Sequence, residues 1–110
     1  MRKTMRTISI CIAAMLLFAA LVSRAAAPIR VMILDGESGG PYHQWELVTL
    51  VLKKELDETG LFQVDVVTAP RAGSDFSSFR PDFGTYQVVV FNYDAPDERW
   101  PAELKASRSH

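Results

Sequence analysis

The sequence contains one cysteine, Cys11, and it lies in an apolar segment close to the N-terminus. Removal of that segment would leave a chain in which no disulfide could stabilise the fold and no thiol could act as a nucleophile. Histidine is also scarce, with two residues in 110. Because no two histidines have the close spacing of a zinc motif such as H-x-x-x-H, we expect no metal and no cofactor.

The motifs of phosphate binding and of serine hydrolases are absent as well. The glycine-rich loop at residues 36–40, GESGG, lacks the Lys and Ser/Thr of a P-loop and the glycine spacing of a dinucleotide-binding fold. Glu37 within that loop would repel a phosphate. No serine lies in a G-x-S-x-G turn, so the sequence gives no support for a covalent acyl-enzyme.

Residues 1–27 have the pattern of a signal peptide. A basic start precedes the apolar run 8–22, and small residues then form two overlapping cleavage motifs, Ser23-Arg24-Ala25 and Ala25-Ala26-Ala27. We expect an exported protein, periplasmic or secreted, with no stable membrane insertion after cleavage. An uncleaved anchor is the alternative, because the 17 residues 7–23 lie at the lower edge of the ~17–25 that span a bilayer.

The charge balance changes once this leader is removed. Residues 1–27 hold four of the 12 basic residues and none of the 13 acidic ones, so residues 28–110 carry a formal net charge of −5. A nucleic-acid-binding protein needs a clustered basic face to neutralise phosphates. We therefore expect no nucleic-acid partner.

Residues 28–110 are enough for one small α/β domain. Apolar runs predict strands at 30–35, 61–68 and 87–93, and apolar residues at helical spacing predict a helix over 44–59. Parallel strands joined by right-handed crossovers give a sheet of order 2-1-3, as in flavodoxin-like folds. The outer edge of the third strand is then unpaired, which indicates that the domain is truncated.

The connection over residues 69–86 is rich in aromatic residues. Phe76, Phe79 and Phe83 recur at helical spacing, but Pro81 interrupts any single helix. We expect a broken helix that packs on the sheet, with an aromatic ligand box as the alternative. A further helix is predicted to begin at Ala102, after Pro101 in its first turn.

Polar residues follow the first and the third predicted strands. Ligands of α/β sheets bind beyond the carboxyl ends of the strands, where neighbouring connections leave in opposite directions. We therefore expect a crevice between the strands 30–35 and 87–93. The residues that reach it are Asp35, Gly36, Glu37, Ser38, Gly39, Gly40, Tyr42, His43, Asn92, Tyr93, Asp94 and Asp97.

His43 is the candidate catalytic residue, because imidazole can exchange protons near neutral pH, and Asp94, or Asp97, is its candidate acid/base partner. A structural role, in which His43 bonds the loop backbone, is equally open. The candidate ligand-binding residues are Asp35, Gly36, Gly39, Gly40, Asn92 and Tyr93. Asp35 has the alternative role of holding the turn after its strand.

Three residues near the C-terminal end have simpler interpretations. Trp100 could stack on a sugar ring, as could Tyr93, but packing against the end of the sheet is favoured. Glu98 and Arg99 are predicted to be solvated charges beside the next helix.

Three segments together resemble the ThuA-like, or trehalose-utilisation, family: VMILDGESGGPYHQW, LKKELDETGLFQVDVVTAP and FRPDFGTYQVVVFNYDAPDERWPAELKA. The resemblance runs from Arg30 to about Ala106. It implies a flavodoxin-like fold similar to class I glutamine amidotransferases, without their nucleophilic cysteine. It also implies a role related to sugars, whose chemistry is poorly defined for most members.

The resemblance extends to single residues. It matches His43 to the histidine of the family's glycine-rich loop, and Asn92-Tyr93 to the end of its third strand. Family members continue beyond the position of Ala106, so residues 28–110 correspond to the N-terminal part of a ThuA-like domain. We expect a small-molecule sugar ligand that the complete protein binds or processes. The alternatives are a non-catalytic module for a glycan or protein partner, and an inactive truncated product.

Overall fold

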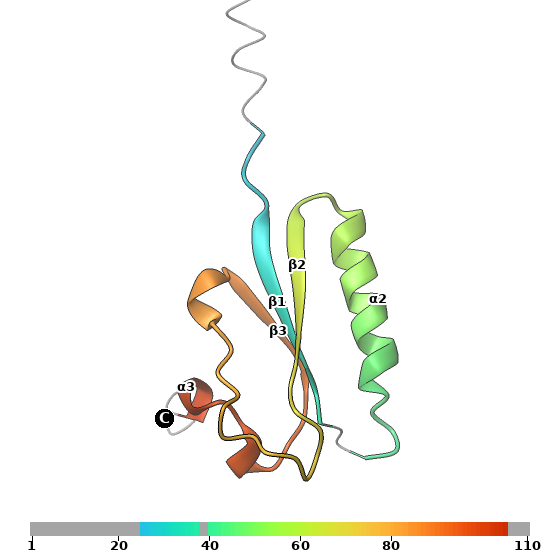
Figure 1. Cartoon of the computed structure of the whole chain (residues 1–110). Helices are drawn as coiled ribbons and strands as arrows, with labels where there is room; N and C mark the ends of the chain where they lie inside the picture. Colours follow the sequence, from blue (N-terminus) through green and yellow to red (C-terminus); the bar gives the residue numbers. More distant parts are fainter. Residues whose placement is uncertain (1–24, 38–39, 106–110) are drawn as a thin grey trace, which may run out of the picture.

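Strand β1 (Ile29–Gly36) is the centre of the fold, and residues 31–36 of it are buried. In the computed structural model, which describes residues 25–37 and 40–105, β1 pairs in parallel with β2 (Phe62–Thr68) and with β3 (Val88–Tyr93). The sheet order is β2-β1-β3 (Figure 1). The predicted fold class and strand order are confirmed.

Helix α2 (Trp45–Glu58) joins β1 to β2 and is one residue shorter at each end than predicted. Its Leu52 and Leu56 pack against β1 residues Val31 and Ile33 and form one apolar cluster with the sheet. The predicted apolar stripe is only partly correct. Leu47, Val48 and Val51 belong to it by spacing, but each is at least 40% exposed.

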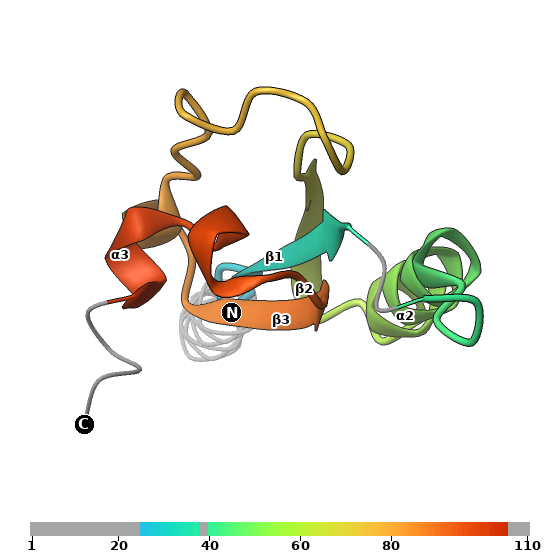
Figure 2. The same cartoon turned by 90° about the horizontal axis from the view of Figure 1, so that it is seen from below.

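The other face of the sheet is covered by the connection between β2 and β3 and by the segment after β3. Figure 2 shows these segments and α2 on opposite sides of the sheet. Met32 and Leu34 of β1 are the buried centre of this second cluster. The partly buried residues packed on it include Phe76, Phe79, Phe83, Tyr86, Trp100 and Leu104.

The aromatic residues of this connection pack on the sheet as predicted, but the broken helix is wrong. Only Phe83 lies in a helical turn, the 3-10 helix η1 (Phe83–Thr85). Phe76 and Phe79 lie in irregular chain with their ring centroids 5.2 Å apart. Apolar burial therefore fixes the rings without a regular backbone.

Two short helices follow β3: the 3-10 helix η2 (Asp97–Arg99) and α3 (Ala102–Lys105). Helix α3 begins at the predicted residue, directly after the buried Pro101. β3 is an edge strand and exposes Val88 and Phe91, which are 42% and 49% accessible. No helix within residues 25–37 and 40–105 is long and apolar enough to cross a membrane; the predicted leader, with Cys11, lies outside the described residues.

Candidate functional site

The imidazole of His43 contacts the end of β3. His43 lies in the loop before α2, and its Nε2 is 2.8 Å from Oδ1 of Asn92. Asn92 is buried, whereas His43 is half-buried. No strand separates β1 from β3, so the structure brings together these two predicted site residues, which lie 49 positions apart in the sequence.

Asn92 continues into a buried network that ends at Asp35. Its Nδ2 donates to the Trp45 carbonyl at 2.8 Å and to the Thr49 hydroxyl at 2.9 Å. Thr49 in turn donates to Asp35 Oδ2 at 2.7 Å, and Thr68 donates to Asp35 Oδ1 at 2.6 Å. Both carboxylate oxygens of Asp35, which is 2% exposed, therefore join α2 and β2 to the central strand.

Tyr93 faces the opposite side of the sheet from Asn92, because successive side chains of a strand alternate. It packs with Met32 and Leu34, and its hydroxyl donates to the Arg99 carbonyl. Burial raises the pKa of Tyr93 to about 12, and the nearby charge of Glu37 adds to this effect. The phenol and the imidazole of His43 thus do not share one hollow.

Glu37 forms a buried ion pair with Arg99 at the carboxyl end of β1. The Arg99 guanidinium also donates to the carbonyls of Pro70, Arg71 and Ser74, at 2.8–2.9 Å. The prediction that Arg99 is a solvated charge is therefore wrong. Three carbonyls and one carboxylate replace water as acceptors around the guanidinium. Only Arg carries enough N–H donors in one planar group to serve all four.

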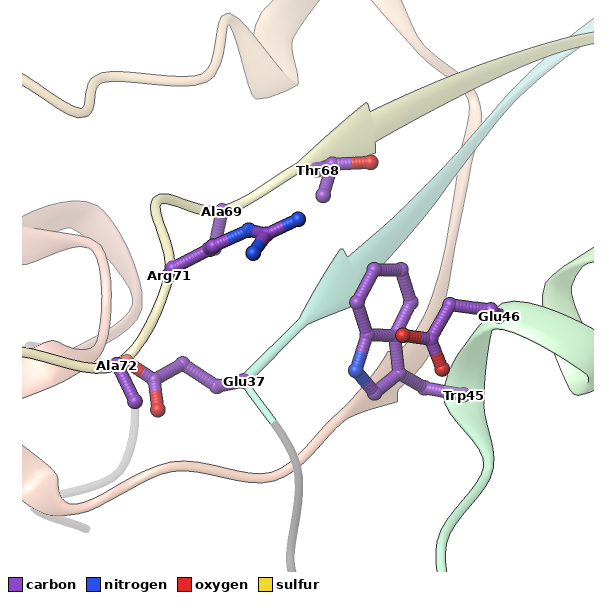
Figure 3. A pocket seen from close by; sticks show the side chains of 7 residues that line it. All are labelled: Glu37, Trp45, Glu46, Thr68, Ala69, Arg71 and Ala72. Carbon is purple, nitrogen blue, oxygen red and sulfur yellow. The ribbon is translucent and has the colours of Figure 1, made fainter.

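A pocket of about 500 Å³ opens beside this ion pair, at the carboxyl ends of β1 and β2 (Figure 3). It is lined by Glu37, Trp45, Glu46, Thr68, Ala69, Arg71 and Ala72. This pocket lies on the β2 side of β1, whereas the crevice was predicted on the β3 side. Trp45 and Glu46 at the start of α2 line the pocket on the β2 side, and the sequence did not predict this position of the helix.

Arg71 and Trp45 reach the pocket from opposite sides, and the Glu46 carboxylate lies beside the indole (Figure 3). Within the described part of the chain, none of the three side chains has a hydrogen bond or an ion pair. A guanidinium, a carboxylate and an indole N–H are thus available to a ligand. Trp45, Glu46, Thr68 and Arg71 were not among the site residues predicted from the sequence. The only signal for Thr68 and Arg71 was their place at the end of the second strand.

Among the remaining candidates, Gly40 contacts His43, because its carbonyl accepts a hydrogen bond from the His43 backbone N–H at 3.2 Å. Asp94 is exposed just beyond β3, and Tyr42 is 99% exposed. Gly36 has a φ of +97° and Gly40 a φ of +107°, while Ser38 and Gly39 lie outside the described residues. No group of three His, Cys, Asp or Glu side chains in the described ranges could hold a metal ion.

Comparison with known proteins gave one informative similarity. No family model matches the chain, and no curated protein matches it. The crystal structure of a protein from Parabacteroides merdae, described as ThuA-like, superimposes with a TM-score of 0.63 at 36% sequence identity. The match covers 74% of this chain and 27% of the relative.

At 36% sequence identity, the two proteins are similar in amino-acid sequence as well as in fold. The chain spans about a quarter of the relative's length, so the activity of the complete relative is not carried over with the fold. The resemblance of this chain to a ThuA-like protein is thus confirmed, over 74% of the chain.

Proposed function

We propose that this chain supplies a carbohydrate-binding site of a ThuA-like protein, at the pocket between the ends of β1 and β2. The observation that carries the proposal is the pairing of the half-buried Trp45 with Arg71 across about 500 Å³ of open space. Small-molecule pockets have volumes of roughly 300–1,000 Å³ and combine apolar surface with a few polar groups.

The lining matches the two surfaces of a sugar. The flat indole of Trp45 suits the C–H face of a pyranose ring. The Arg71 guanidinium donates hydrogen bonds and the Glu46 carboxylate accepts them, so that together they can pair with ligand hydroxyls, which do both. Glu37 is occupied by Arg99, which leaves Arg71 and Glu46 as the charged groups open to the ligand.

The test uses the chain with Trp100→Phe, because Trp45 and Trp100 are its two tryptophans and Trp45 then remains the sole indole. Trehalose, glucose and galactose are titrated while indole fluorescence is recorded. We expect a saturable change for at least one sugar, and Arg71→Met should weaken binding about tenfold, the loss of one hydrogen bond to a charged group.

The matched control is Arg80→Met, which removes an exposed guanidinium that does not line the pocket. It should leave sugar binding unchanged. The proposal is wrong if no sugar gives a saturable change, or if the two arginine variants weaken binding equally.

Processing of a sugar is a separate proposal, which rests on the sequence pattern because neither residue lines the pocket: His43 would exchange protons with the ligand and Asp94 would assist. The alternative is binding without turnover, by a module that presents the site to a glycan or protein. Substituting the counterparts of His43 and Asp94 in a complete ThuA-like protein separates them. Loss of turnover with retained binding favours catalysis, whereas absence of turnover in the unmodified protein favours a binding module.

Export is also proposed, from the pattern of residues 1–27. Expression of the full chain in a bacterial host should yield a processed form in the periplasm. N-terminal sequencing would locate the cleavage after Ala25 or Ala27. An unprocessed chain in the membrane fraction would favour the anchor.

A further inference from the structure

The side-chain amide of Asn92 has one possible orientation in this structure. Its nitrogen lies 2.8 Å from the carbonyl oxygen of Trp45, and a carbonyl can only accept a hydrogen bond. The NH₂ group must therefore face Trp45 and Thr49, and the amide oxygen must face His43. Asn92 is 5% exposed, so water does not compete for these contacts.

The direction of the next hydrogen bond agrees with this orientation. The Thr49 hydroxyl gives its single hydrogen to the Asp35 carboxylate, at 2.7 Å. It can therefore only accept from Asn92 Nδ2, at 2.9 Å. The donor directions are thus the same from Asn92 through Thr49 to the buried Asp35.

These contacts decide which nitrogen of His43 carries hydrogen. Asn92 Oδ1 is an acceptor, so the His43 Nε2 atom 2.8 Å away must be the donor. We infer that Asn92, held by Thr49 and Trp45, fixes neutral His43 as the Nε2–H tautomer and leaves Nδ1 as its hydrogen-bond acceptor. No described residue bonds Nδ1, which leaves this atom to a ligand.

Asn92 is therefore a positioning residue. The hydrogen bond that it accepts from Nε2 of the imidazole determines that the other ring nitrogen, Nδ1, carries no hydrogen. An unprotonated Nδ1 can accept a hydrogen bond from a ligand group that donates, such as the hydroxyl of a sugar. It cannot pair with a carbonyl oxygen, which is itself only an acceptor. This last step rests on the proposed function, whereas the tautomer is a property of the chain without ligand.

The tautomer can be measured directly on the ¹⁵N-labelled chain by long-range ¹H–¹⁵N correlation at alkaline pH, where imidazole is neutral. The two histidines are distinguished by the signals that disappear in His43→Gln. We expect His43 to show a protonated-type Nε2 and an unprotonated-type Nδ1. A predominant Nδ1–H form, or an equal mixture of both forms, would overturn the inference.

A variant pair identifies Asn92 as the cause. Asn92→Leu keeps the approximate size but offers no acceptor, so the two His43 nitrogens should move toward averaged shifts. Thr85→Val, which alters an exposed hydroxyl in η1, should leave both nitrogens unchanged. Retention of the single tautomer in Asn92→Leu would contradict the role of Asn92. The wild-type measurement remains decisive if that variant does not fold.

Titration of trehalose, glucose and galactose into the same labelled sample separates the inference from the proposed function. A shift of Nδ1 on sugar binding supports both. The expected tautomer with no response of Nδ1 to any sugar supports the inference and counts against a sugar contact at His43, whereas the Trp45 fluorescence titration tests the pocket itself.

Discussion

Arg99 and Glu37 form an ion pair that joins the segment after β3 to the end of β1, across 62 positions of sequence. The two side chains are only 14% and 5% exposed. Glu37 also has a φ of +42°, in the left-handed region that non-glycine residues seldom adopt. With the hydrogen bonds of Arg99 to the Pro70 and Arg71 carbonyls, the pair joins the end of β1, the segment after β3 and the connection over residues 69–86 at one edge of the pocket.

Removal of one member of this pair is expected to destabilise the fold strongly. Arg99→Ala leaves the Glu37 carboxylate buried without a counter-charge, which typically costs about 3–5 kcal/mol. Lys53→Ala is the control, because Lys53 pairs with Asp57 on the exposed face of α2, where such a pair contributes about 0.3–0.5 kcal/mol. Chemical denaturation measures both losses, and similar small losses would contradict the structural role of Arg99.

Gly36 and Gly73 both have positive φ, at +97° and +81°, but they differ in their surroundings. A Cβ at Gly36 would lie 2.9 Å from the Ala69 nitrogen, whereas a Cβ at Gly73 would meet nothing within 4 Å. Gly73→Ala should therefore cost about 1–2 kcal/mol from backbone conformation alone. Gly36→Ala should cost more, seen as a larger drop in Tm; equal drops would show that the strand end can move aside.

The raised pKa of Tyr93 predicts a loss of stability at alkaline pH. The unfolded phenol ionises near pH 10, but the folded one, desolvated and close to Glu37, ionises near pH 12. Between these values the unfolded state loses its proton first, so the free energy of unfolding falls as pH rises from about 10 to 12. Tyr93→Phe should reduce this alkaline fall and remove the last step of the ultraviolet tyrosine titration. An unchanged titration would contradict the burial.

Thr49 tests the hydrogen bond to Asp35 separately from its packing. Thr49→Val keeps the shape of the side chain but removes the donor to the buried Asp35 carboxylate and the acceptor of Asn92 Nδ2, and should cost at least about 1.5–3 kcal/mol. Thr49→Ser keeps the hydroxyl and should retain more of the stability, since it loses only a methyl group. Equal losses in urea denaturation would show that packing, not the hydrogen bond, sets the role of Thr49.

The local elements were predictable because each depends on residues close together in sequence. The run at 31–34 and the alternation of Phe62, Val64 and Val66 with polar residues predicted two strands within one residue of their bounds. The helix over 45–58 followed from helical spacing. The order β2-β1-β3 then followed from the handedness of crossovers between parallel strands.

The candidate site was predicted less completely. His43 and Asn92 were both identified from their places after β1 and at the end of β3, and they do meet. Tyr93 was assigned to the same hollow, although alternation along a strand sends adjacent residues to opposite faces. Here a rule available from sequence would have corrected the prediction. Arg71 and Glu46 gave no comparable signal.

The sequence by itself determined the secondary structure, the strand order and the edge of the sheet where polar residues gather, because periodicity and strand ends are local properties. Only the tertiary structure decided which polar groups meet: Asp35 with Thr49 and Thr68, and Arg99 with Glu37. Each partner was selected by the burial of charged and hydrogen-bonding groups on segments 14 to 62 positions apart in the sequence. Buried polar and charged groups need hydrogen-bond or ion-pair partners within the protein, because water no longer contacts them. The spacing of residues in the sequence does not predict which groups become partners.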